Sequence, residues 1–421
     1  MKKIYILFLT VITCSPILSQ TDTTINTFSQ VHQRFGGGYD TRTVVDTFIF
    51  PSDLSMYSKI NVRIQLTCPT GGCDPWDRFA NLKIVNNGED FEIARYMTPY
   101  KKACGWTVDV TDYRNMLTDT VILKSFIDTW VNPAWLVTYY FDFIAGTPTY
   151  NYVKIDNLWQ NEYLVYGDTT QPVAPKLTPV FISTDLNVQQ AIIRVVNTGH
   201  GQGNTNNAAE FSSKTHYLLF NDDTVFSQFL WRTDCGNNPT CNNQQGTWQY
   251  SRANWCPGKA VDPDDFDVTS MITKGTSEKY EYKLAEYFNS CSPNNPGCTN
   301  GGSCPDCNYN YNGHTEPHYK IHAQLIQRSN LPMNTKNEFK TIFFEAQVYP
   351  NPTGSVINIS ANQKIKSLTI FNLLGEKISQ VFSQNIISFE EVPEGMYFLE
   401  VVGEQNKTVK KIQKVQSPPS N

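Results

Sequence analysis

Short runs of alternating apolar and polar residues, separated by turn residues, recur along nearly the whole chain. In the first third such runs lie at 47–50, 60–66, 82–85, 107–110, 121–127 and 137–144. Alternation of this kind is typical of half-buried strands, and its close spacing favours an antiparallel sandwich or jelly roll. Because aromatic residues make up 13% of the chain and long amphipathic runs are few, the sequence predicts an all-β extracellular protein.

Residues 1–20 have the pattern of a secretory signal peptide. Two lysines precede an apolar run at 4–12, and the run is too short to remain as a membrane anchor. Cys14 raises a lipoprotein alternative, but Thr13 before it matches that pattern poorly. The net charge is −5 and the basic residues are scattered, so nucleic acid is not an expected partner.

The cysteine count supports export. Of eleven cysteines, Cys14 belongs to the leader, and the remaining ten are expected to form disulfides. Cys68 with Cys73, and Cys235 with Cys256, are the local pairs. Two further disulfides are expected in a Pro/Gly/Asn-rich insertion that holds Cys291, Cys298, Cys304 and Cys307. Whether Cys104 pairs with Cys241 is left open.

Breaks in the pattern divide the chain. Gly146-Thr-Pro148 marks a boundary between two β blocks, and a polar connector precedes a last block of short strands. The predicted segments are a first domain at 21–148, a second at 149–331 with the insertion at 289–313, a linker at 332–344 and a small Ig-like sandwich at 345–417.

Several residues that could bind or react with a ligand lie close together between Cys68 and Arg78. A ring closed by two cysteines five residues apart leads directly into Trp76, Asp77 and Arg78. A carboxylate fixed beside an aromatic ring and a guanidinium is suited to handling sugars and polarised amides. The alternative interpretation is a surface ion pair at a disulfide-pinned turn.

Other candidate site residues follow a strand, lie in a long loop or adjoin a cysteine. Asp128 and Trp130 follow a predicted strand, which delivers a second carboxylate and a second tryptophan together. The alternative is that Trp130 is a core residue and Asp128 a cap. Glu210 is the one glutamate in a long polar loop between two apolar strands, and loops of that length are commonly functional or disordered. Arg252 and Trp255 adjoin Cys256 of the predicted Cys235–Cys256 disulfide.

Taken together and in order, these motifs resemble the peptide-N-glycosidase F family, which comprises secreted bacterial amidases. The resemblance covers about residues 27 to 331 and implies two eight-stranded jelly rolls packed side by side, with the active site in the cleft between them. It is carried by Cys68…Cys73-Asp-Pro-Trp-Asp-Arg, Met97-Thr-Pro-Tyr100, Val108-Asp-Val-Thr-Asp112, Asp128-Thr-Trp130, Gly146-Thr-Pro148, Glu210…Thr215-His216 and Arg252-Ala-Asn-Trp-Cys-Pro-Gly258.

The resemblance also implies an activity and roles for residues. The family hydrolyses the amide that joins the first N-acetylglucosamine to asparagine, leaving aspartate and releasing the glycan. It implies that Asp77 is the essential aspartate, that Glu210 holds a water opposite it, and that Asp128 replaces a glutamate of the family. The implied sugar-facing residues are Arg78, Trp130, Arg252 and Trp255. The scheme requires no metal or other cofactor.

The chain departs from the family pattern in several places. Where the family glutamate is flanked by two cysteines, this chain has Ala208 and Ser212, and Phe211 replaces a tryptophan. A substrate-facing tryptophan of the family falls on Thr198. We expect these changes to alter the glycan cores that fit or to lower the rate.

Other chemistries are less well supported by the residues. Cys304-Pro-Asp-Cys307 is half a zinc signature, and His314, His318 and His322 recur every four residues, but Pro317 argues against a helix and export favours disulfides. Copper monooxygenases share the double jelly-roll architecture, but this chain has no comparable set of histidines near the motifs of the cleft. The fold alone does not indicate their activity. A serine or cysteine nucleophile also lacks its motif.

The last block resembles the C-terminal sorting domain of the type IX secretion system of Bacteroidetes, through Tyr349-Pro-Asn-Pro, Leu373-Leu-Gly, Gly395-Met-Tyr-Phe and a terminal basic strand. This implies release from, or attachment at, the outer-membrane surface of a Gram-negative bacterium; an ordinary appended β module is the alternative. The sequence therefore predicts a secreted or surface-held monomeric amidase acting on N-linked glycoproteins. A catalytically inactive glycan-binding protein on the same fold is the alternative.

Overall fold

A computed structural model describes residues 21–292, 294, 316–334, 341–342, 346–361, 364–403 and 407–416. The predicted signal peptide and most of the predicted insertion lie outside the described residues. Strands dominate the described chain, with three short 3-10 turns, η1 (Thr111–Met116), η2 (Ala174–Lys176) and η3 (Thr205–Asn207). In the part of the chain that the structure describes, no helix is long and apolar enough to cross a membrane.

The first unit is built from two four-stranded antiparallel sheets and one small hairpin. Apart from one hairpin, in which two consecutive strands pair within one sheet, consecutive long strands alternate between the sheets, and this order is consistent with a jelly roll. One sheet has the order β1 (Thr23–Gln33), β10 (Trp135–Ala145), β5 (Tyr57–Thr67), β8 (Cys104–Asp109). The other has the order β4 (Thr43–Ile49), β9 (Thr120–Ile127), β6 (Phe79–Asn86), β7 (Glu89–Met97). The hairpin pairs β2 (Phe35–Gly36) with β3 (Tyr39–Asp40).

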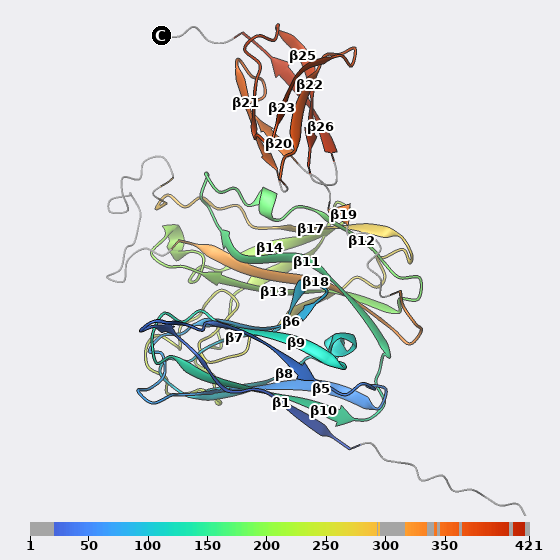
Figure 1. The fold of residues 1–421 in the computed structure, drawn as a ribbon. Helices are drawn as coiled ribbons and strands as arrows, with labels where there is room; N and C mark the ends of the chain where they lie inside the picture. Colours follow the sequence, from blue (N-terminus) through green and yellow to red (C-terminus); the bar gives the residue numbers. More distant parts are fainter. Residues whose placement is uncertain are drawn as a thin grey trace, which may run out of the picture.

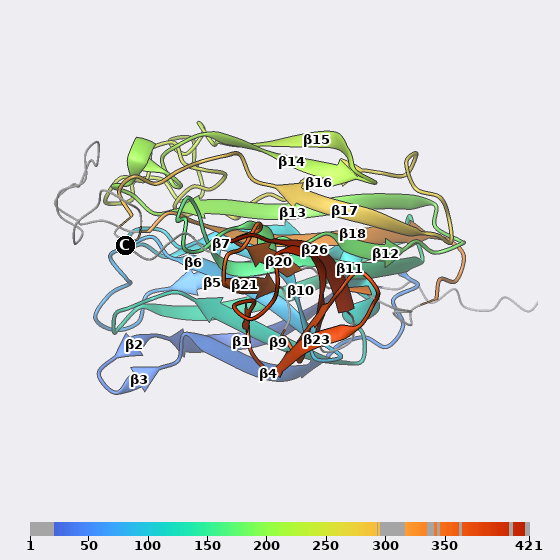
Figure 2. The ribbon, with the colours of Figure 1, turned by 90° about the horizontal axis from the view of Figure 1, so that it is seen from above.

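The second unit repeats the same strand order. Its first sheet runs β11 (Tyr152–Val165), β18 (His318–Ser329), β13 (Gln190–His200), β16 (Asp264–Asp267). Its second sheet runs β15 (Asp223–Leu230), β14 (Lys214–Phe220), β17 (Ser277–Lys283), β12 (Val180–Ser183), with β19 (Thr341–Ile342) added at the edge. Figures 1 and 2 show the four sheets of the two units stacked in layers.

A smaller third module follows, drawn at the top of Figure 1. It has a three-stranded sheet of β20 (Ala346–Tyr349), β21 (Val356–Ala361), β24 (Ile386–Ser388) and a four-stranded sheet of β23 (Lys377–Phe382), β22 (Ser367–Phe371), β25 (Gly395–Val402), β26 (Lys407–Lys414). The two sheets enclose a separate apolar core centred on Ile357, Leu368 and Phe389.

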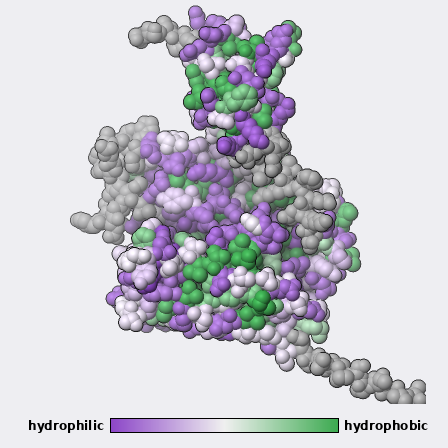
Figure 3. Space-filling view, in the orientation of Figure 1, coloured by the Kyte–Doolittle hydropathy of each residue, from purple (hydrophilic) through white to green (hydrophobic). Residues whose placement is uncertain are grey.

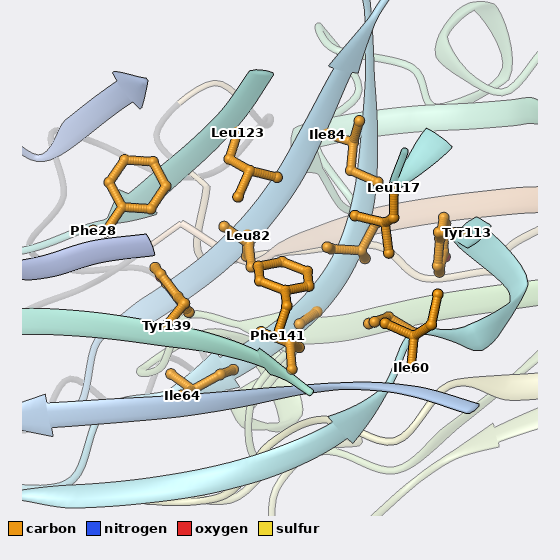
Figure 4. Close-up of a cluster of buried hydrophobic side chains, with 14 of the residues drawn as sticks. Phe28, Ile60, Ile64, Leu82, Ile84, Tyr113, Leu117, Leu123, Tyr139 and Phe141 are labelled. Atoms are coloured by element: carbon orange, nitrogen blue, oxygen red, sulfur yellow. The ribbon is translucent and has the colours of Figure 1, made fainter. Parts of the chain in front are cut away.

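Alternation along each strand explains the core of the first unit. On β5, Val62, Ile64 and Leu66 are buried, whereas Arg63 and Gln65 between them are exposed. Figure 4 shows such side chains from several strands pointing into one interior, among them Ile60, Ile64, Leu82, Ile84, Leu123, Tyr139 and Phe141. Figure 3 shows apolar residues also gathering on one outer face of this unit.

The two jelly-roll-like units share an interface. A small apolar cluster crosses it, made of Phe79, Met97, Trp255 and Val261. Arg95 of the first unit donates to the Lys320 carbonyl at 2.7 Å in the second unit. A disulfide between Cys104 and Cys241 also joins the units. The end of β7, the start of β6 and the 252–256 segment are therefore held in a fixed relation.

Candidate active site

The disulfide-closed ring holds the loop before β6. Cys68 and Cys73 are bonded as the sequence predicted, and the next residue, Asp74, is completely buried. The Asp74 carboxylate accepts hydrogen bonds from the Trp76 amide at 2.9 Å, Arg78 Nε at 2.8 Å and Thr129 Oγ1 at 2.6 Å. Because one buried carboxylate binds Trp76 and Arg78 on either side of Asp77 and also Thr129 of a second segment, Asp77 is presented in a fixed place.

Arg252 lies at the centre of the site and is 1% exposed. Its Nε donates to Glu210 Oε1 at 3.0 Å, and its Nη2 lies 3.6 Å from Asp77 Oδ2. Other donors of this guanidinium are used by the carbonyls of Thr247 and Tyr250. One buried guanidinium therefore brings together a carboxylate from each unit.

The Glu210 loop is tied to the same segment as Arg252. The Ala253 amide donates to the Glu210 carbonyl at 2.8 Å, and the Glu210 amide donates to the Gly201 carbonyl at 3.2 Å. The second predicted local disulfide, Cys235 with Cys256, is also formed, next to this segment. These backbone bonds orient the loop that lacks the cysteine bracing expected from the family.

The electrostatics of the two carboxylates favour retention of a proton. Burial raises the pKa of Asp77, and the positive charge of Arg252 opposes that effect. Burial also raises the pKa of Glu210 to about 8, again opposed by Arg252 and reinforced by the negative charge of Asp77. Asp77 Oδ2 is buried and has no hydrogen-bond partner among the described residues. The groups that face the Asp77 carboxylate are the Arg252 guanidinium and the Tyr100 side chain.

Replacing Glu210 by Gln should reduce the pH dependence of thermal stability. The unfolded chain loses the Glu210 proton near the ordinary pKa of about 4.5, whereas the folded protein keeps it to about pH 8. The stabilising contribution is therefore complete below about pH 4.5 and is lost as the pH rises to about 8. Glutamine stays neutral, so between pH 5 and 8 the melting temperature of Glu210→Gln should fall less than that of the wild type.

The control for this comparison is Glu286→Gln, since Glu286 is an exposed glutamate of the same unit. It should keep the wild-type slope of melting temperature against pH. An equal slope in Glu210→Gln would contradict the retained proton.

Asp128 stands apart from this pair. Its amide donates to the Phe79 carbonyl at 2.9 Å, which fixes it at the end of β9. Among the described residues no hydrogen bond or ion pair links its side chain to Asp77, Glu210 or Arg252. Its charge instead opposes the lowering of the Lys320 pKa by burial. The role predicted for Asp128 stays a prediction.

The predicted sugar-facing residues differ in how exposed they are. The Trp130 side chain is 54% exposed and has one edge against Phe35. The Arg78 guanidinium is engaged with Asp74. Trp255 is buried; its Nε1 donates to the Gly199 carbonyl at 2.7 Å, and its ring lies 4.9 Å from the Arg252 guanidinium. In the structure Arg78 and Trp255 support the site from within, and their contact with substrate stays a prediction.

Sequence reasoning gave no role to Tyr100, which also lies at the site. Its hydroxyl is 3.4 Å from Arg252 Nη2 and 3.2 Å from Thr247 Oγ1. Burial, followed by the charge of Asp77, raises the pKa of Tyr100, so the hydroxyl remains protonated. The motif Met97-Thr-Pro-Tyr100 was the only signal, and it carried no chemistry by itself.

The structure describes only part of the cysteine-rich insertion and of the histidines considered as an alternative zinc site. His314, Cys298, Cys304 and Cys307 lie outside the described residues. His318 and His322 lie on β18, where the His318 ring stacks on Tyr163. In the described ranges no group of three or more histidine, cysteine or acidic residues is placed to hold a metal ion.

Comparisons with known proteins show which families and solved structures the chain is similar to. The family model "Peptide-N-glycosidase F, C terminal" matches residues 170–303, and "Secretion system C-terminal sorting domain" matches residues 347–415. The structure of PNGase F from Flavobacterium meningosepticum, described as a glycosylasparaginase, superposes with a TM-score of 0.64 and 27% identity over 75% of this chain and 98% of that one. A structure of PNGF-II matches with a TM-score of 0.56 and 14% identity over 74% of this chain and 66% of that one, which shows the fold alone.

A curated relative is the peptide-N(4)-(N-acetyl-beta-D-glucosaminyl)asparagine amidase F of Elizabethkingia miricola. It is 31% identical over 328 residues, which span 74% of this chain and 86% of the relative. By this identity and coverage, the chain belongs to the peptide-N-glycosidase F family.

Proposed function

We propose that this protein hydrolyses the amide between asparagine and the first N-acetylglucosamine of N-linked glycoproteins, with Asp77 and Glu210 as the catalytic groups. We assign these residues because the Arg252 guanidinium lies between their two carboxylates, one from each unit. An amide is a poor electrophile, so its hydrolysis needs a base for water and an acid for the departing nitrogen.

The two carboxylates are suited to divide these tasks. Two acids that share one cation do not ionise alike, and the proton kept by the pair to about pH 8 is assigned to Glu210. Asp77 takes a proton from water as the water oxygen bonds to the amide carbon. Glu210 gives its proton to the nitrogen as the carbon–nitrogen bond breaks. The products are aspartate in the peptide and a glycosylamine, which water then converts to the free glycan and ammonia.

Asp128, Trp130, Arg78 and Trp255 complete the proposal. Trp130 offers an exposed indole face to the CH groups of a sugar, and Asp128 supports the site from the end of β9. Arg78 and Trp255 keep Asp77 and Arg252 in position, as well as facing the sugar. We propose that the protein acts as a monomer, since each unit supplies one carboxylate within a single chain.

The sorting domain accounts for where the protein works. Its presence at residues 347–415 indicates export by the type IX secretion system and a location outside the cell or at its surface. N-linked glycoproteins outside the cell are substrates that such an enzyme can reach. An inactive glycan-binding protein on the same fold has no need of two carboxylates on one guanidinium.

The experiment that tests the reaction is mass spectrometry of an N-glycopeptide incubated with the enzyme in water enriched in heavy oxygen. The expected products are an intact glycan and a peptide whose asparagine has become aspartate carrying the label. Cleavage between the two N-acetylglucosamines would contradict amide hydrolysis. Binding without release, across several glycan types, would support the inactive alternative.

A further inference from the structure

The hairpin of β2 and β3 lies beside Trp130. The Phe35 amide donates to the Val131 carbonyl at 3.2 Å, and the Phe35 ring lies 5.1 Å from the Trp130 ring. Residues 36–38, all glycines with positive φ, make the tight turn that returns the chain to Tyr39. Figure 2 shows this hairpin at one end of the first unit, projecting past the larger sheets.

Two arginines brace the aromatic rings of the hairpin and its neighbour. The Arg42 guanidinium lies 4.3 Å from the Trp130 centroid and 4.5 Å from the Phe35 centroid, and Asp40 holds it through bonds of 2.9 and 2.7 Å. The Arg34 guanidinium lies 3.4 Å from the centroid of Tyr39. The rings are therefore fixed before any ligand arrives, which lowers the entropic cost of binding.

Two large rings remain open to solvent on this surface. Trp130 is 54% exposed and Tyr39 is 48% exposed, although each has an arginine against its ring. A braced ring with an open face is an amphipathic surface on which the CH groups of a sugar can stack. We name the surface formed by Phe35, Tyr39 and Trp130, with Arg34 and Arg42, the hairpin platform.

The hairpin platform is continuous with the proposed active site. Trp130 follows Thr129, whose hydroxyl donates to Asp74, and Asp74 fixes the loop that carries Asp77. The Ile127 amide donates to the Arg42 carbonyl at 3.0 Å, so the base of the hairpin is tied to the end of β9 beside Asp128. The hairpin platform is therefore joined to the Asp77 loop through Thr129 and Asp74, and Tyr39 is carried by the hairpin that packs on Trp130.

We propose that the hairpin platform binds sugars of the N-glycan beyond its two innermost N-acetylglucosamines, an inference that rests on the proposed amidase function. Tyr39 is the residue that recognises this outer part of the glycan. The platform belongs to the first unit alone, and Asp40 neutralises Arg42. Both guanidinium groups of the platform lie against aromatic rings, so ring stacking on sugar faces provides most of the binding.

The test compares two substrates on one peptide, one carrying only two N-acetylglucosamines and one carrying a complete branched N-glycan. Tyr39→Ala should lower kcat/KM for the complete glycan by about tenfold, corresponding to about 1.4 kcal/mol, mainly through KM. It should leave kcat/KM for the short glycan unchanged. Tyr39→Phe, which keeps the ring, should retain most of the binding, and Tyr217→Ala, at another exposed tyrosine on β14, is the matched control.

Each other outcome overturns the proposal. Equal losses on both substrates would place Tyr39 against the peptide or the innermost sugars. Wild-type values on both would show that the platform binds nothing the enzyme uses. Melting curves of the variants establish that they are folded. If the wild type released neither glycan, the amidase function would fail instead, and that result is distinguishable from a failure of the platform alone.

Discussion

Replacing Asp77 by Asn should lower the rate of glycan release by about 10²- to 10⁴-fold, the usual contribution of a general acid or base. Asparagine has the same size as aspartate but cannot take a proton from water. The fold should tolerate the change, because the pKa of Asp77 is raised by burial and a neutral side chain avoids that desolvation. The measurement is glycan release from a glycopeptide, with a melting curve of the same sample.

A matched variant lies three residues away in the same loop. Asp74→Asn removes a carboxylate that accepts hydrogen bonds from Trp76, Arg78 and Thr129, and Asp74 is completely buried. We expect this variant to lose stability by about 1–3 kcal/mol, whereas Asp77→Asn keeps the wild-type melting temperature. An Asp77→Asn enzyme with more than a tenth of the wild-type rate would refute the assignment.

The contrast between these aspartates also shows what a sequence can reveal. Both lie in Cys73-Asp-Pro-Trp-Asp-Arg, and local reasoning gave attention to Asp77 because tryptophan and arginine flank it. The buried Asp74 carboxylate accepts a hydrogen bond from Thr129, which is 55 residues away in the chain. Contacts over that distance leave no local pattern, so the residue that fixes the loop was not predicted.

Strands and local disulfides could be predicted from the sequence, because the residues that form them lie close together in the chain. The alternation of Val62, Ile64 and Leu66 reports directly on the buried face of β5, and the all-β prediction is confirmed. Cys68 with Cys73 was predictable from a ring of six residues, whereas the pairing of Cys104 was left open. Its partner, Cys241, is 137 residues away and belongs to the other unit.

The convergence of Asp77 and Glu210 has a similar explanation. The long polar loop drew attention to Glu210, but only the resemblance to a family placed it opposite Asp77. The physical link is Arg252, which each carboxylate meets through the interface of two separately folded units. Alternation within strands contains no information on how two sandwiches pack. The predicted third acid, Asp128, has no described contact with this guanidinium.

Replacing Arg252 by Met should cost about 3–5 kcal/mol of folding free energy at neutral pH, as expected when one partner of a buried ion pair is removed. Methionine fills a similar volume but leaves the carboxylates of Asp77 and Glu210 without their cation. It also leaves the carbonyls of Thr247 and Tyr250 without their donor. Glycan release should be lost as well.

The pH dependence of this loss separates charge from packing. Arg252 opposes the rise of both carboxyl pKa values, so without it the folded-state values rise further above those of the unfolded chain. Stability then falls more steeply as the pH rises, and the deficit of Arg252→Met relative to wild type should be larger at pH 8 than at pH 4.5. Urea denaturation followed by tryptophan fluorescence at both pH values measures it.

Arg232→Met is the control, because the Arg232 side chain is 23% exposed and pairs with Asp234 and Asp262 near the surface. That change should cost about 0–1 kcal/mol. If Arg252→Met does not fold, Arg252→Lys keeps a charge but loses the forked geometry, so it should show a smaller deficit that grows less steeply with pH. A deficit that did not grow with pH would mean that Arg252 acts by packing. The charge of Arg252 would then not set the pKa values of the two carboxyl groups, and the division of acid and base between them would need another cause.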